Sequence, residues 1–180
     1  MFSKGLLPLA MLACLTVATP AAAQQPVRPA LPVFPAISAA DCDQPARRDL
    51  LLGRDSPFAS IRGAADEYNA GWGRVLDWRT AELVRLGHWR DADVQAFRQH
   101  LAQNETLMAE VRTGMQLAIR TLMPALGIVA NESRPIRERC LALVRAAGTL
   151  DQIVASAERQ WRMMADALAR EAARFGVSFD

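Results

Sequence analysis

Four polar residues have types and positions that could form a small ligand site. Arg79 falls within an otherwise apolar helical face, and His100, Asn104 and Glu105 lie in the next long amphipathic stretch. A guanidinium beside an imidazole and an amide could hold an anionic ligand through charge-assisted hydrogen bonds. We favour the simpler interpretation, in which Arg79 reaches the surface along its aliphatic stem and Asn104 fixes helix register.

A second candidate chemistry is non-covalent haem binding, with His100 as one axial ligand and Met108, Met115 or Met164 as the other. Methionines at helical spacing are more often flexible core fillers, so we expect no cofactor. His88 and His100 are the only histidines, and Glu-x-x-His, His-Glu-x-x-His and Cys-x-x-Cys-His do not occur. The usual di-iron, zinc-protease and covalent-haem bundles are thereby excluded by pattern.

Enzymatic function has little support from the sequence. No Gly-x-Ser-x-Gly motif or strand pattern is present to hold a serine nucleophile. Lys4 is the only lysine, so lysine nucleophiles are lost once the leader described below is removed. The small formal net charge of +2 argues against the clustered basic face that nucleic-acid binding needs.

An aromatic and basic stripe is the first of two candidate partner surfaces. Arg74, Trp78 and Arg85 fall on one helical stripe away from the main apolar face, and tryptophan and arginine are enriched at binding hot spots. A broad buried face would instead place Trp78 at the edge of the core, which we favour. We expect Trp89, in the following turn, to be the exposed aromatic residue.

The second candidate partner surface is a proline-rich arm over residues 24–40. Prolines recur every third residue from Pro26 to Pro35, the period of a polyproline II helix, so we expect an extended segment. The same period aligns Leu31 and Phe34 along one edge. That edge either rests on the domain or docks on a partner, and the composition leaves both open.

The first 23 residues have the features of an export signal. A basic residue precedes a short apolar run, and a small-residue cleavage site ends at Ala23. The arginine- and alanine-rich composition is typical of a GC-rich bacterial genome, so we expect a periplasmic or secreted protein. Lipidation at Cys14, in a sequence resembling the end of a lipobox, is the alternative. No later segment is expected to be long enough to span a membrane.

Cys42 and Cys140 remain after cleavage at Ala23. In an oxidising compartment an even pair is usually a disulfide, and two isolated thiols are the alternative. Closing so long a loop would stabilise the fold by roughly 4 to 5 kcal/mol on the chain-entropy model. The bond would tie the first helix to the fourth and fix where the arm leaves the domain.

Long amphipathic helices must position all of these residues. The central one is expected to carry an apolar seam from Val94 to Leu122, whose one gap is Asn104. Partner helices must cover this seam, because packing supplies most of the stability of a helix. The expected helices are residues 45–52; 57–86, stopped by Gly87; 91–123, ended or kinked by Pro124; 133–147, interrupted at Gly148; and 150–175, begun by a capping box at Thr149.

Together these elements predict an all-α fold, an antiparallel four-helix bundle with a short extra N-terminal helix and a proline-rich arm. Residues 1–23 are assigned to the signal peptide, 24–40 to the arm and 41–180 to the bundle domain. We expect a non-enzymatic accessory or interaction module of a bacterial cell envelope, with another envelope protein as its partner. The alternative is a small-ligand carrier for haem or an anionic metabolite.

Overall fold

The fold is entirely helical over the residues that the structure describes. The computed structural model describes residues 25–34, 36–53 and 56–179, and no strand occurs among them. The all-α class predicted from the sequence is therefore confirmed. The expected signal peptide with Ala23 and Cys14 lies outside the described residues, as does Pro35 of the arm.

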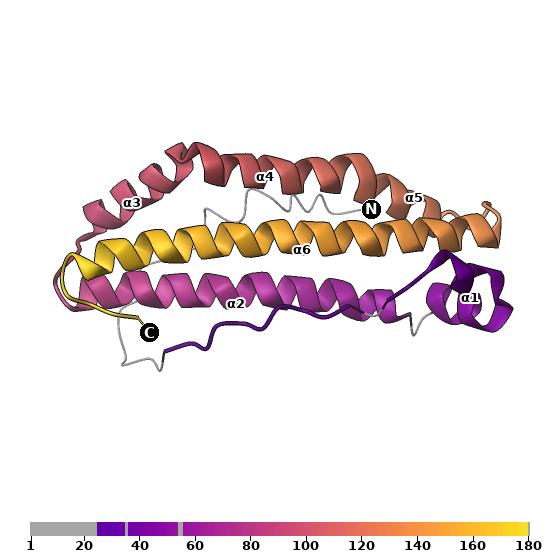
Figure 1. The fold of residues 1–180 in the computed structure, drawn as a ribbon, viewed down its shortest axis with the longest axis horizontal. Coiled ribbons are helices and arrows are strands. Elements are labelled where there is room, and N and C mark those ends of the chain that lie inside the picture. The colour runs from indigo at the N-terminus through magenta and orange to yellow at the C-terminus, as the bar shows by residue number, and fades with distance from the viewer. Residues whose placement is uncertain (1–24, 35, 54–55, 180) are drawn as a thin grey trace. The chain divides into compact units, whose positions relative to one another are not determined.

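The helices follow one another through short connections (Figure 1). The short helix expected over residues 45–52 is confirmed, and the long helix that follows it ends within one residue of its expected end. In chain order the elements are the 3-10 helix η2 (Ala39–Asp43), α1 (Pro45–Leu52), α2 (Pro57–Arg85), α3 (Asp91–Gln103), α4 (Glu105–Leu117), the π-helix η3 (Ala118–Leu122), α5 (Met123–Ala130) and α6 (Ile136–Ala173).

The chain divides into two compact units, which are described here one at a time. The described part of unit 1 covers residues 25–30, 69–111 and 158–179. That of unit 2 covers residues 31–34, 36–53, 56–68 and 112–157. Helices α2, α4 and α6 each contribute residues to both units, because the unit boundaries fall within them.

Unit 1 has a core of aromatic and aliphatic side chains from α2, α3 and the end of α6. The indole nitrogen of Trp161 on α6 donates a 2.9 Å hydrogen bond to Asn69 Oδ1 on α2, so this aromatic ring is held at both its apolar and its polar end. The buried apolar side chains of this unit include Trp72, Val75, Leu76, Leu83, Trp89, Val94, Phe97, Leu101, Trp161, Met164 and Leu168.

Glycines in the left-handed region end two helices of unit 1. Gly87 after α2 and Gly176 after α6 have φ values of +75° and +72°. After Gly87, the backbone N–H of His88 donates a 3.0 Å hydrogen bond to the Leu83 carbonyl. After Gly176, the N–H of Val177 donates in the same way to the Ala172 carbonyl, five residues earlier. These bonds satisfy carbonyls that the helix leaves unpaired, and both predicted helix ends are confirmed.

Asn104 divides the expected central helix into α3 and α4. Its backbone is extended, with φ −73° and ψ 105°, and its Oδ1 accepts a 2.9 Å hydrogen bond from Leu107 N. A residue whose side-chain oxygen accepts a hydrogen bond from the backbone N–H three residues later is an N-cap, and a new helix begins after it. The expectation of one continuous helix was wrong here, because the amide side chain replaces a backbone acceptor.

Pro124, in unit 2, does not end the helical path. The π-helix η3 precedes it and α5 continues to Ala130. Proline lacks the N–H of a regular helical bond and its ring crowds the preceding turn, and a wider π-turn accommodates both. The prediction that Pro124 ends the helix was wrong, and the alternative of a local distortion holds.

Helix α6 runs through Gly148 without a break. The hydroxyl of Thr149 donates a 2.8 Å hydrogen bond back to the Arg145 carbonyl, as within a continuous helix, and does not cap a new one. The expected interruption was wrong, and with it the fourth separate helix of a four-helix bundle. One unbroken seam explains this: the buried residues Leu143, Ala147, Leu150, Val154, Ala157, Trp161, Met164 and Leu168 follow at three- and four-residue spacing.

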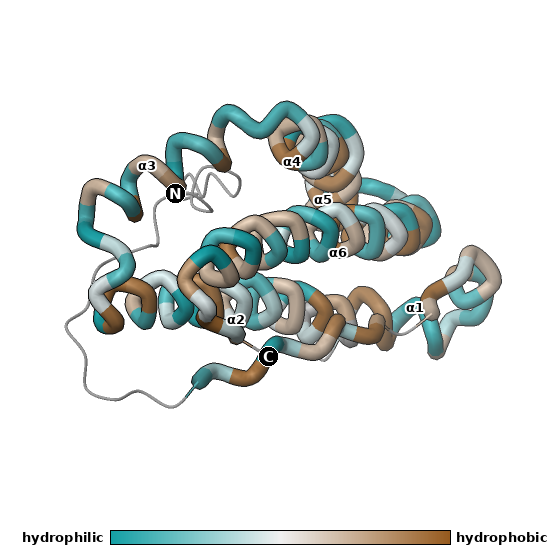
Figure 2. The backbone as a smooth tube through the Cα atoms, turned by 60° about the vertical axis from the view of Figure 1, so that its left-hand side comes forward, coloured by the Kyte–Doolittle hydropathy of each residue, from teal (hydrophilic) through white to brown (hydrophobic). Residues whose placement is uncertain are grey.

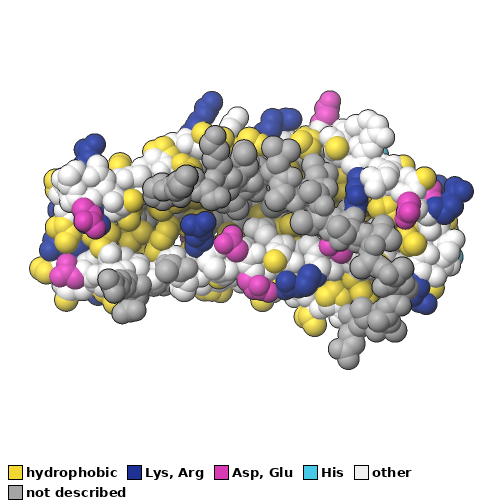
Figure 3. Space-filling model, turned by 180° about the vertical axis from the view of Figure 1, so that it is seen from behind, with side chains coloured by type: hydrophobic (Ala, Val, Ile, Leu, Met, Phe, Trp, Pro, Cys, Tyr) yellow, Lys and Arg dark blue, Asp and Glu magenta, His cyan; other side chains and the backbone are white. Residues whose placement is uncertain are grey.

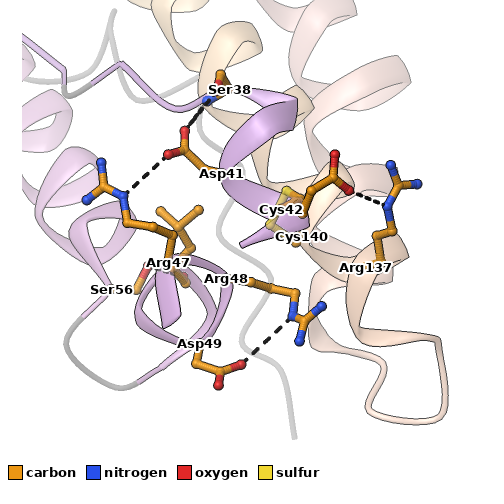
Figure 4. Close-up of a disulfide and its surroundings, with 11 residues drawn as sticks. Ser38, Asp41, Cys42, Arg47, Arg48, Asp49, Ser56, Arg137 and Cys140 are labelled. Carbon is orange, nitrogen blue, oxygen red and sulfur yellow. Dashed lines mark hydrogen bonds and ion pairs between the residues drawn. A yellow bond between two sulfur atoms is a disulfide. The ribbon is translucent and has the colours of Figure 1, made fainter. Parts of the chain in front are cut away.

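Unit 2 is tied by a disulfide between Cys42 in η2 and Cys140 in α6 (Figure 4). The two Cα atoms lie 5.6 Å apart and the cysteines are 98 residues apart in sequence. The predicted pairing is therefore confirmed. Both cysteines are fully buried and form a cluster with the buried Leu51 and Leu143. The partly buried side chains packed on this cluster are Ile37, Leu52, Phe58, Val129, Leu141 and Val144.

Charged residues surround the disulfide at the surface of unit 2. Arg137 Nε lies 2.8 Å from Asp43 Oδ1, so Asp43 pairs with α6 and does not cap α1. Hydrogen bonds from the backbone N–H and then the hydroxyl of Ser38 lower the pKa of Asp41, which also faces Arg47 (Figure 4). These exposed pairs add little stability by themselves, so the apolar cluster and the covalent bond hold η2 in place.

Replacing Cys140 with serine tests the role of the bond. We expect the free energy of unfolding to fall by up to about 4 to 5 kcal/mol on the chain-entropy model. Amides of η2 and α1 should exchange faster, while those of α2 from Ile61 onward keep their protection, because the shorter elements depend on the bond and on the small apolar cluster around it. Chemical denaturation and hydrogen exchange measure the two effects.

The double variant C42S/C140S is the control, since it removes the free thiol that the single variant leaves. It should lose about as much stability as C140S. Peptide mapping of the unreduced protein checks the premise, and free thiols at both Cys42 and Cys140 would contradict the pairing.

Gly71 and Gly73 on α2 form a matched pair of tests in unit 1. A Cβ at Gly71 would lie 2.9 Å from Pro29 Cβ, whereas one at Gly73 would have no neighbour within 4 Å. G73A should therefore raise the free energy of unfolding by up to about 1 kcal/mol through helix propensity. G71A should lose that gain to the clash with Pro29.

Thermal denaturation of both variants and of P29G/G71A makes the comparison. Removing the proline ring should restore the gain in the double variant. Equal stabilisation by G71A and G73A would show that Pro29 does not pack on α2.

Candidate functional site

Arg79 is buried in unit 1 and does not reach the surface. Its side chain is 2 % exposed, and its Nη2 donates a 3.3 Å hydrogen bond to the carbonyl of Phe179. The guanidinium carbon also lies 5.3 Å from the centre of the Phe179 ring, within the range of a cation–π contact. The interpretation in which Arg79 reaches solvent was therefore wrong, because the C-terminal segment supplies its partners.

Phe179 is the anchor of that C-terminal segment, which passes back along α2 (Figure 1). The ring is 6 % exposed and meets Trp78 edge-on, with centroids 6.1 Å apart. Gln25 Nε2 donates a 3.1 Å hydrogen bond to the same carbonyl that Arg79 uses. Trp78 is thus half-buried against the segment, which agrees with its expected place at the edge of the core.

The other three residues of the predicted ligand site have separate surroundings. His100 is exposed at the end of α3, Glu105 is exposed in the first turn of α4, and Asn104 caps α4 with its side-chain oxygen. Arg79 faces the C-terminal segment. The anion site made from these four residues stays a prediction.

Trp89 is buried, contrary to the expectation that it would be the exposed aromatic residue. It is 6 % exposed and its ring lies 5.3 Å from that of Phe97. Trp89 precedes the N-cap Arg90, and an apolar residue at that position packs back onto the new helix as a hydrophobic staple. That position is the sequence signal that could have identified it as core.

The two arginines of the predicted stripe are exposed on α2. Arg85 pairs with Glu82 three residues earlier, with Nε 2.8 Å from a carboxylate oxygen, and Arg74 lies one helical turn before Trp78. Because Trp78 faces Phe179, the stripe presents its charges and only part of its aromatic ring. Whether Arg74, Trp78 and Arg85 bind a partner stays a prediction.

The charges of Asp77 and Arg98 interact in unit 1, which the sequence alone did not predict. Both side chains are half-buried, on α2 and α3, and among the described groups nothing accepts a hydrogen bond from the buried Nε and Nη2 of Arg98. Burial raises the pKa of Asp77 from 3.8 to about 6, although the charge of Arg98 opposes the shift. Spacing alone does not separate Asp77 from carboxylates on the solvated faces.

The arm exposes a different edge from the one predicted. Val27 is 89 % and Val33 is 94 % exposed, and the intervening Ala30 is also exposed, so an apolar edge repeats every third residue. Of the predicted edge, Leu31 is 47 % exposed and Phe34 is half-buried. The three prolines Pro26, Pro29 and Pro32 are half-buried.

Two helical stretches are long and apolar enough to cross a membrane by length and composition. One is Glu105–Ala130, which combines α4, η3 and α5, and the other is Ile136–Ala173, which is α6. Within α6 44 % of the most apolar window is buried, as in a core helix, but in Glu105–Ala130 only 6 % is buried. The expectation that no later segment has this length was therefore wrong.

Comparisons with protein-family models, curated proteins and solved structures give no match. Among residues 25–34, 36–53 and 56–179, no group of three or more histidine, cysteine, aspartate or glutamate side chains is placed to hold a metal ion. The described residues also present two exposed apolar surfaces, the edge of the arm and the surface of α4, η3 and α5.

The raised pKa of Asp77 predicts how pH affects stability. The folded chain binds the proton of the Asp77 carboxyl more tightly than the unfolded chain, in which the pKa of this group is 3.8. The contribution of the protonated carboxyl to the free energy of unfolding is therefore complete below pH 3.8. It is lost as the pH rises through about 6. In Asp77→Asn this loss is absent, so the melting temperature of the variant relative to the parent should increase from about pH 4 to about pH 7.

Thermal denaturation across this pH range measures the difference. Asp166→Asn, on an exposed position of α6, is the matched control and should show a constant difference from the parent. A constant difference for Asp77→Asn as well would contradict the assignment.

Proposed function

We propose that this chain is an exported, non-enzymatic module of a bacterial cell envelope that binds another protein through its arm, residues 25–38. The leader-like first 23 residues motivate the export. The buried pairing of Cys42 with Cys140 is consistent with an oxidising compartment such as the periplasm. The helical domain then acts as the scaffold that holds the arm.

The observation that carries this proposal is the exposed apolar edge of Val27, Ala30 and Val33. The side chains of these two valines are 89 % and 94 % exposed to water. Burying them against a partner surface would therefore be favourable through the hydrophobic effect. Prolines between them restrict the backbone, so little conformational entropy is lost when the edge is bound. A proline-rich segment with apolar side chains on one edge is the kind of ligand that aromatic-lined grooves bind.

The covalent bond near the end of the arm supports the same function. Cys42 follows the arm by a few residues and is fixed to α6 through the disulfide. At the other end Pro29 packs on Gly71 of α2. An arm held near both ends presents its outer edge at lower entropic cost than a free tail.

Site-specific photo-crosslinking in the host cell tests the proposal. A photoreactive amino acid replaces Val27 or Val33, and in the control it replaces Gln103, an exposed residue at the end of α3. We expect one discrete protein adduct in the envelope fraction from both arm positions and none from Gln103. The substitutions fall on exposed side chains, so the fold should be retained.

The double variant V27E/V33E should abolish capture of the same adduct when the crosslinker is moved to Ala30. Its thermal stability should stay within about 0.5 kcal/mol of the parent, as for other surface substitutions. Absence of an adduct from the arm, or equal adducts from Gln103, would overturn the proposal.

A further inference from the structure

A second surface, independent of the arm, lies on the part of Glu105–Ala130 that belongs to unit 2. We call residues 112–130 the apolar helix surface. Ile119 and Met123 are each 62 % exposed, and Ala125 is the only buried residue in this range, the others being half-buried or exposed. Helix α5 contains no charged residue, and Figure 2 shows brown, hydrophobic backbone beside its label.

The charges on this surface are all positive. No aspartate or glutamate occurs between Glu110 and Glu132, while Arg112 and Arg120 are both exposed. Arg112, Gln116, Ile119, Arg120 and Met123 follow at helical spacing, so the guanidinium groups flank the exposed apolar side chains.

Arginines elsewhere in the described chain are commonly matched by carboxylates. Arg134 pairs with Glu138, Arg162 with Glu158 and Arg174 with Glu171. On the face drawn in Figure 3, arginines and acidic side chains are interspersed. Among the described residues, neither Arg112 nor Arg120 has an ion-pair partner. The apolar helix surface therefore lacks the local anions that balance other parts of the chain.

We propose that the apolar helix surface docks on an anionic phospholipid membrane, with its axis in the plane of the interface. Ile119 and Met123 enter the boundary between headgroups and acyl chains, and Arg112 and Arg120 contact lipid phosphates. An exposed apolar face flanked by basic residues is the composition of interfacial helices. Anionic headgroups supply the negative charge that this stretch of sequence does not contain.

Two other arrangements fit the charges less well. If the helix crossed the bilayer, Arg120 would lie near the middle of Glu105–Ala130, where burial of a guanidinium is most costly. If a second copy of the chain covered the surface, Arg112 and Arg120 of both copies would meet without a carboxylate in this stretch. An anionic surface provides a counter-charge for both arginines at once.

Flotation with lipid vesicles tests the proposal on the protein as purified from its host, so that every variant has the same N-terminus. The vesicles contain phosphatidylglycerol and phosphatidylcholine in equal parts, or phosphatidylcholine alone. The parent should float with the anionic vesicles and stay in solution with the neutral ones. R112Q/R120Q should weaken partition roughly 30-fold, and I119Q/M123Q at least about tenfold.

The matched control is R62Q/R170Q, which removes the same charge from exposed positions on α2 and α6. It should float like the parent. Failure of the parent to bind anionic vesicles, or equal weakening in the control, would overturn the proposal. So would a concentration-dependent dimer in sedimentation equilibrium that I119Q/M123Q returns to monomer, because the occupant would then be a second copy.

Discussion

Burial of a guanidinium within the apolar face of α2 is the constraint on which unit 1 depends. A charged group removed from water is destabilising unless other groups replace its hydration. Phe179 replaces part of it with a carbonyl oxygen and an aromatic face, and both come from a segment beyond the last helix. The position of Arg79 therefore requires the C-terminal segment to fold back, and Gly176 provides the left-handed turn that permits it.

The helix ends were predictable where a single backbone requirement decided them. Gly87 and Gly176 adopt the left-handed conformation that glycine tolerates best, and proline at the first position of α1 matched the observed start. Signals inside long helices were less reliable. Gly148 and Thr149 resemble a stop and a start, but the apolar seam of α6 continues on both sides and outweighs about 1 kcal/mol of glycine propensity.

Asn104 shows the opposite error. It was interpreted as a polar gap in a continuous seam, although asparagine is among the best N-cap residues and its own side chain could begin a helix. The two interpretations differ only in the backbone angles of one residue, which periodicity does not determine.

The surfaces were less predictable than the helices. The threefold period of the arm was visible in the sequence, but which of its edges faces water depends on the contact between Pro29 and Gly71. The burial of Asp77 and Arg98 likewise arises from packing between α2 and α3. By contrast, the absence of acidic residues from 111 to 131 was visible in the sequence from the start. That stretch supports a proposal only together with the exposure of Ile119 and Met123, which the sequence did not predict.

The shared carbonyl of Phe179 has a consequence for the order of events during synthesis. Gln25 and Arg79 both donate hydrogen bonds to this oxygen. Gln25 and Phe179 are 154 residues apart in sequence, so unit 1 joins two distant parts of the chain. A ribosome releases the chain from its N-terminal side, so α2 emerges before the residue whose carbonyl accepts the hydrogen bond of Arg79. Unit 1 can therefore complete this contact only after residue 179 has been synthesised, which makes it one of the last contacts of the unit to form.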